Sequence, residues 1–103
     1  MTTSGKMAEA AATIRAEAQR LGVTVTGHDG IVTVRKTFTP GDKAAYVTAE
    51  SDCYAILRHF RMVRAGSVWG TDSGSVGGAV GLEGGYCVLN MSGVAVRLVR
   101  ALG

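Results

Sequence analysis

Apolar residues near the start of the chain recur every three or four positions, which is the period of one face of an α-helix. The members of this stripe are Met7, Ala11, Ile14, Ala18 and Leu21. Gly22 follows the stripe directly, and glycine commonly ends a helix because it accepts a left-handed backbone. The pattern predicts a helix over about 6–21, preceded by a flexible start at residues 1–5.

The next segment, GVTVTGHDGIVTVRKTF, changes to a period of two. Its alternating apolar positions are Val23, Val25, Val32, Val34 and Phe38. The letters HDG between the two runs can form a tight turn, so the segment predicts a β-hairpin with one buried face. Lys36 falls on that same face, so either the strand register shifts or the lysine stem extends out to solvent.

The letters TPGD predict the start of a second helix. Thr39 can cap it, Pro40 suits its first position, and Asp42 meets the positive end of the helix dipole. Its apolar face comprises Tyr46, Ala49, Cys53, Ile56, Leu57 and Phe60. Its polar face comprises Lys43, Glu50, Asp52, Arg58 and Arg61.

Beyond Met62, short apolar runs are separated by turn-forming residues. We interpret MVRAGSVWG, SVGGAVGL and YCVLNM as three strands joined by turns at TDSG and EGG. Ser92 can then cap a last helix, GVAVRLVRAL, with Val94, Leu98 and Leu102 facing inward. The sequence therefore predicts a single α+β domain over residues 1–103, with the order α-β-β-α-β-β-β-α. Tight turns between strands favour a mainly antiparallel sheet with the helices packed on one face.

Composition and charge narrow the functional classes. The net charge is +3 and the isoelectric point is about 9.2, with arginine outnumbering lysine, which is typical of a GC-rich genome. Cys53 and Cys87 form no CxxC pair and are expected to be buried thiols in a reducing compartment. The start of the chain lacks the profile of a signal peptide, and no apolar run is long enough to cross a bilayer. We expect a cytoplasmic protein that does not engage a membrane.

The glycine-rich stretch GSVWGTDSGSVGGAVGLEGGYCVLN fails the spacing rules of nucleotide-binding loops. No two glycines in the chain lie two positions apart, as GxGxxG requires, and no lysine follows Lys43, as a phosphate-binding loop requires. The cysteines and histidines also lack the spacing of a metal site. The sequence therefore predicts neither a cofactor nor a metal.

Candidate catalytic groups do not assemble into a known arrangement. The letters TDSGS resemble the segment around the serine of chymotrypsin-like proteases, but His28 and His59 are the only histidines and neither is placed as its base. A β-turn explains Asp72 and Ser73 equally well. A pair of Cys87 and His59 would need an exposed thiol, whereas YCVLN is typical of a buried strand. We expect no enzymatic activity.

An arginine-rich surface remains as the main candidate site. Its members are Arg58, Arg61, Arg64, Trp69, Arg97 and Arg100, which together could bind an anion or nucleic acid. Cations near the end of a helix also stabilise its dipole without any ligand, so both explanations stay open. A second candidate is self-association, because side-chain-poor strands such as SVGGAVGL leave a flat surface and an exposed edge.

A resemblance to a known family covers about residues 38–102. It rests on the runs FTPGDKAAYVTAESDCYAILR, GSVWGTDSGSVGGAVGL, GGYCVLNMSGV and RLVRAL. These runs resemble a family of short, uncharacterised accessory proteins encoded by actinobacterial phages. The resemblance implies a phage or prophage origin and action in the cytoplasm of a bacterial host, and it assigns no role to any residue.

Two hypotheses of function follow. The first is a non-enzymatic accessory binding protein that engages nucleic acid through the arginine-rich surface. The second is a protein-interaction module, either monomeric or homodimeric, that binds or inhibits a host protein.

Overall fold

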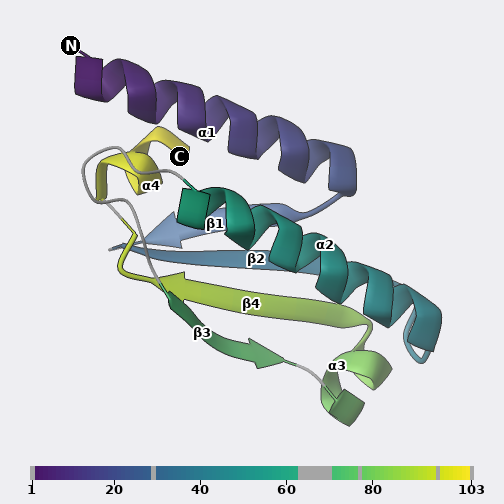
Figure 1. Cartoon of the computed structure of the whole chain (residues 1–103). Coiled ribbons are helices and arrows are strands. Elements are labelled where there is room, and N and C mark those ends of the chain that lie inside the picture. Colours follow the sequence, from purple (N-terminus) through teal and green to yellow (C-terminus); the bar gives the residue numbers. More distant parts are fainter. Residues whose placement is uncertain (1, 29, 63–70, 77, 95, 103) are drawn as a thin grey trace.

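The computed structural model describes residues 2–28, 30–62, 71–76, 78–94 and 96–102 (Figure 1). Side chains are described in these ranges except at 2–4, 6–7, 61–62, 71–76, 78–79 and 96–97. The helices are α1 (Thr2–Leu21), α2 (Lys43–Met62), α3 (Gly78–Gly84) and α4 (Val96–Leu102). The strands are β1 (Thr24–His28), β2 (Ile31–Thr37), β3 (Thr71–Val76) and β4 (Tyr86–Ser92).

The strands form one sheet in the order β1-β2-β4-β3, and every neighbouring pair is antiparallel. The predicted hairpin is confirmed, with Val25 opposite Val34 and Gly27 opposite Val32. Residues that face one another across strands share a side of the sheet. The strand alternation therefore places Val32, Val34 and Leu89 on one side of the sheet and their sequence neighbours on the other.

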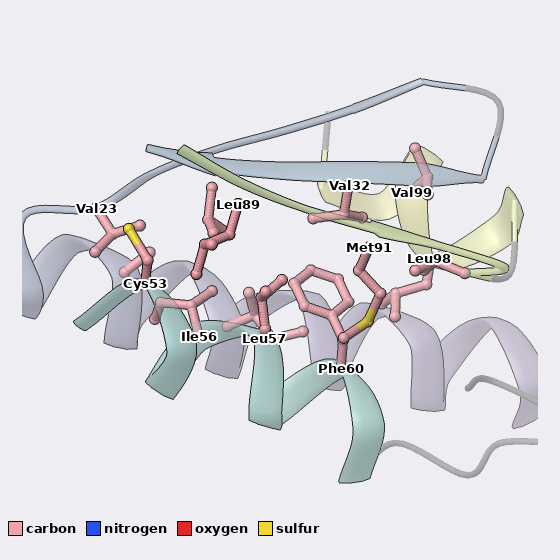
Figure 2. Close-up of a cluster of buried hydrophobic side chains, with 14 of the residues drawn as sticks. Val23, Val32, Cys53, Ile56, Leu57, Phe60, Leu89, Met91, Leu98 and Val99 are labelled. Carbon is pink, nitrogen blue, oxygen red and sulfur yellow. The ribbon is translucent and has the colours of Figure 1, made fainter. Parts of the chain in front are cut away.

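Helices α1 and α2 lie on one face of this sheet, as predicted (Figure 1). Helix α2 crosses β2 and β4, while α1 contacts β1, α2 and α4. In Figure 2, Phe60 of α2 lies beside Met91 of β4 and Leu98 of α4 between the sheet and the helices. All three side chains are fully buried. The apolar stripes therefore meet in one core, which confirms the single α+β domain.

The start of α2 differs from the prediction by a few residues. The backbone carbonyl of Thr39 accepts a hydrogen bond from the amide of Asp42 at 3.1 Å, and Gly41 has a φ of 82°. TPGD is therefore a tight turn before the helix. The side chain of Asp42 then accepts a bond from the amide of Ala45 at 3.0 Å. Asp42 is therefore the capping residue, and the prediction of a cap at Thr39 is wrong. Proline followed by glycine favours the turn over an earlier helical start.

The glycine-rich region is where the predicted element order is wrong. The letters TDSG, predicted as a turn, lie within β3, which pairs with β4 through an irregularity between Asp72 and Ser75. Most of SVGGAVGL, predicted as a strand, lies in the helix α3. The order is therefore α-β-β-α-β-α-β-α, and the predicted strand over 62–70 falls largely outside the described residues.

Backbone hydrogen bonds fix the last turn of helix α3 and join it to the TPGD turn. The amide of Gly85 donates a hydrogen bond to the carbonyl of Gly81 at 3.0 Å, as in a helix. The carbonyl of Leu82 accepts a hydrogen bond from the amide of Gly41 at 2.7 Å. Gly85 has a φ of 75°, and a side chain there would lie 2.7 Å from the carbonyl oxygen of Phe38. Glycine at this position therefore lets the chain end α3 and enter β4 beside the TPGD turn.

Two long polar side chains join the elements. Lys36 stays on the helix-covered face, where its Nζ donates at 2.6 Å both to the carbonyl of Leu21 and to Asp52 Oδ2. The register therefore does not shift, and Asp52, predicted on the polar face of α2, points toward the end of α1. Arg15 of α1 donates to the carbonyls of Ala101 and Leu102 at 2.9 and 3.0 Å, which satisfies the last turn of α4.

Candidate binding surface on the uncovered face of the sheet

Neither α1 nor α2 packs against the second face of the sheet, and α3 meets it only at its end, where Gly84 lies beside the Tyr86 ring (Figure 1). The alternation of the strands places mainly polar residues there, with Ile31 and Val88 as apolar exceptions, because their sequence neighbours fill the core. Its described side chains are Thr24, Thr26, His28, Ile31, Thr33, Arg35, Thr37, Tyr86, Val88, Asn90 and Ser92. We call this set the uncovered face.

One aromatic side chain and one cation meet on the uncovered face. The guanidinium carbon of Arg35 lies 5.3 Å from the centre of the Tyr86 ring, within the range of a cation–π interaction. Arg35 pairs with Val88 across β2 and β4, so Tyr86 is its diagonal neighbour. Tyr86 is half-buried and Arg35 is exposed, so the pair presents both a ring and a charged group to solvent.

The centre of the uncovered face carries hydrogen-bonding groups. Thr33 donates its hydroxyl to Asn90 Oδ1 at 2.9 Å across β2 and β4. Beside this pair lies a shallow, open hollow of about 210 Å³, lined by Thr26, Gly27, His28, Ile31 and Thr33. A ligand on this face would meet hydroxyls and an amide in the middle and the Arg35–Tyr86 pair at one end.

The charge of the uncovered face has one sign. Arg35 is a permanent cation, and none of the described side chains of this face is a carboxylate. The described acidic side chains lie elsewhere. Two examples are Glu17, which pairs with Arg20 on α1, and Asp52 of α2, which pairs with Lys36 on the covered side of the sheet. The surface therefore suits an anionic or neutral polar ligand better than a basic one.

The predicted arginine-rich surface is described only in part. Arg58 of α2 and Arg100 of α4 are both exposed. Arg61 and Arg97 belong to the same two helices, but their side chains are not described, and Arg64 and Trp69 lie outside the described residues. Figures 1 and 2 place the end of α2 and α4 at the same end of the molecule. A shared arginine surface stays a prediction.

The two cysteines are buried free thiols, as predicted. Burial raises the pKa of the Cys53 thiol from its ordinary value of 9.0 to about 12, and burial also raises the pKa of the Cys87 thiol. Cys53 Sγ lies 4.0 Å from the carbonyl oxygen of Cys87, at the contact between α2 and β4. At neutral pH both groups remain protonated and shielded, which makes them poor nucleophiles.

The other catalytic and metal candidates gain no supporting geometry. His28 lines the hollow at the end of β1, and His59 lies on α2. The hydrogen bond from Arg20 is the main cause of the lowered pKa of Glu17 on α1. Asp72 and Ser73 are strand residues of β3. Among the described residues, no group of three or more His, Cys, Asp and Glu side chains is gathered as a metal would require.

Sequence reasoning missed the pairing of Arg35 with Tyr86, because the sequence carries a signal for only one of the two residues. Alternation along β2 places Arg35 opposite in direction to the core residue Val34, which is readable from the sequence. The position of Tyr86 beside it depends on the register of β2 with β4, and no local pattern carries that information.

None of the helices in the described part of the chain combines the length and apolar composition that a membrane span requires. No family model, curated protein or solved structure matches this chain.

Proposed function

We propose that this chain is a non-enzymatic binding protein that holds single-stranded nucleic acid on the uncovered face of its sheet. The observation that carries the proposal is the Arg35 guanidinium over the Tyr86 ring on a face without a described carboxylate. A net charge of +3 supports association with a polyanion. With the resemblance to phage accessory proteins, this implies action in the cytoplasm of a bacterial host.

The chemistry of the uncovered face matches what single strands offer. A base stacked on an aromatic ring contributes about 1–3 kcal/mol, and the stacking tolerates any base sequence. Arg35 would pair with a phosphate next to the base that contacts Tyr86. Thr33 and Asn90 would then hydrogen-bond to sugars or base edges along the strand direction. This arrangement predicts binding with weak sequence preference.

A fluorescence-anisotropy titration with labelled single-stranded DNA and RNA tests the proposal. We expect the logarithm of the binding constant to fall linearly with the logarithm of the salt concentration. Arg35→Ala and Tyr86→Leu should each weaken binding about tenfold. Binding to neither polymer at low salt would contradict the proposal.

The predicted arginine-rich surface supplies the matched controls. Arg58→Ala and Arg100→Ala remove the same charge from exposed positions on α2 and α4. On the present proposal they reduce affinity only slightly, through the loss of long-range attraction. If they abolish binding while Arg35→Ala does not, the helices and not the sheet carry the site.

The second candidate function is a protein-interaction module that binds or inhibits a host protein. It is favoured by exposed apolar side chains on the helices: Val47 on α2 is 58% exposed and Val80 on α3 is 66% exposed. Affinity capture from nuclease-treated host lysate distinguishes the two. A protein partner retained by wild type and lost in Val47→Asp would favour this candidate.

A further inference from the structure

The exposed flank of α2 carries a symmetric pattern of charge. Glu50 lies four residues before Tyr54, and Arg58 lies four residues after it. Residues four apart share one face of a helix, so the three side chains lie in a row. Val47, one further turn toward the start of α2, extends this row. We call these four residues the α2 row.

The α2 row does not face the core or α1. The core side of α2 carries Cys53, Leu57 and Phe60, which are fully buried. Asp52 marks the side toward α1, because Lys36 joins it to the carbonyl of Leu21. Tyr54 follows Asp52 by two residues, and at 3.6 residues per turn it lies about 200° further round the helix. The row therefore occupies the flank of α2 away from α1.

The side chains of the α2 row are accessible, and its two charged groups form no ion pair among the described residues. Val47 is 58% exposed, Tyr54 is 36% exposed, Arg58 is exposed and Glu50 is half-buried. No ion pair joins Glu50 or Arg58 to another described residue. The two charges cannot reach each other either, because eight residues of helix separate them by about 12 Å.

We propose that the α2 row is a self-association surface whose occupant is the same row of a second copy of this chain. In an antiparallel pair of helices related by a two-fold axis at Tyr54, the residue four before the axis meets the residue four after it. Glu50 of each copy then faces Arg58 of the other, so both charges gain opposite partners. A parallel pair would place like charges opposite each other.

The apolar residues complete this interface. The two Tyr54 rings meet at the axis, where paired aromatic rings add to the energy of burial. Val47 leaves solvent as the helices approach to about 8–10 Å between their axes. A single pair of helices buries less area than a typical stable complex, so the dimer forms at high protein concentration. This inference does not depend on nucleic-acid binding, since the uncovered face lies on the other side of the sheet.

Sedimentation equilibrium of the wild type and charge-reversed variants tests the proposal. We expect wild type to dimerise with a dissociation constant below about 1 mM, and Glu50→Arg or Arg58→Glu alone to weaken dimerisation about tenfold or more. The double variant Glu50→Arg/Arg58→Glu exchanges the charges and should restore it. A monomer at all concentrations, or a dimer that ignores both single reversals, would overturn the proposal.

A crosslinking experiment tests the same geometry without changing a charge. With oxidised glutathione as oxidant, Tyr54→Cys should form a disulfide-linked dimer, because its thiol lies at the two-fold axis. The native cysteines are buried and do not interfere. Arg100→Cys, at an exposed position of α4, is the matched control and should remain uncrosslinked. Crosslinking of the control to the same extent as Tyr54→Cys would contradict a specific α2 interface.

Discussion

The two faces of the sheet are built by alternate residues of the same strands. On β2, Val32 and Val34 point to the helices and are fully buried, whereas Thr33 and Arg35 point away from them. On β4 the same backbone presents Leu89 to the core and Asn90 to the opposite side. The covered face stabilises the fold by apolar burial, and the uncovered face keeps polar groups that remain available to a ligand.

The difference between the two faces indicates which residues stabilise the fold and which are available for binding. Apolar burial contributes roughly 25 cal/mol per Å², so the covered face supplies most of the folding free energy. Single polar contacts on a solvated face contribute much less, since water replaces them readily. Changes on the covered face should therefore unfold the protein, while changes on the uncovered face should spare the fold and alter binding.

The largest effect is expected from the core side of α2. Phe60→Ala empties a fully buried site between Met91 and Leu98, and should lower the free energy of unfolding by about 3–5 kcal/mol. Thr26→Ala, at an exposed position of β1, is the matched control and should change it by less than about 0.5 kcal/mol. Urea denaturation measures both. Equal losses would show that the two faces do not differ as described.

A smaller loss should follow from removing the one lysine of the covered face. Lys36→Met leaves Asp52 and the carbonyl of Leu21 without their shared donor, at a cost of about 1–3 kcal/mol. In a double-mutant cycle with Asp52→Asn, the two changes should be clearly less costly together than the sum of the singles. Additive losses would mean that the pair contributes nothing beyond each residue's packing.

The buried thiol on the covered face predicts a loss of stability at high pH. Burial holds the pKa of Cys53 at about 12 when folded, against an ordinary value of 9.0. Below pH 9 both states keep the proton and stability is full. Between pH 9 and 12 the unfolded chain releases it first, so stability falls by up to about 1.4 kcal/mol per pH unit.

Cys53→Ala should lack this part of the pH dependence. Chemical denaturation of both proteins at pH 8 and pH 10 isolates the contribution, because every other titrating group is common to the two. An identical decline in the variant would show that the thiol titrates alike in the folded and unfolded chain.

The smallest effect on stability is expected at the candidate site itself. Arg35→Ala removes only the contact between its exposed guanidinium and the Tyr86 ring, so the free energy of unfolding should fall by no more than about 1 kcal/mol. Thermal denaturation followed by circular dichroism checks this. Unfolding of Arg35→Ala at ordinary temperature would assign Arg35 to the fold instead of to a ligand.

Periodicity in the sequence predicted the parts of this fold that carry side chains. The stripe through Ala11, Ile14 and Ala18 predicted α1, and alternation around Val32 and Val34 predicted the hairpin. Prediction failed between residues 71 and 84, because glycines carry no hydrophobic pattern. There the order depends on pairing with β4 and on the bond from Gly41 to Leu82, neither of which is local.

The candidate site was less predictable than the fold. Arginines stand out in a sequence when they cluster, as near Arg58, whereas Arg35 lies among threonines and valines. The role of Arg35 in the candidate site depends on its contact with Tyr86. Tyr86 is distant in sequence and lies beside Arg35 only because of the register of β2 with β4. Contacts of this kind are set by the whole fold and leave no mark in a single segment.

The most direct test of the uncovered face as a binding surface is a nuclear magnetic resonance titration with unlabelled single-stranded DNA at low salt. The account predicts that the largest amide shifts follow β2 and β4, centred on Arg35 and Tyr86, while the amides of α1 and α2 hardly move. Shifts concentrated on α2 and α4, or no shift at millimolar DNA, would contradict it.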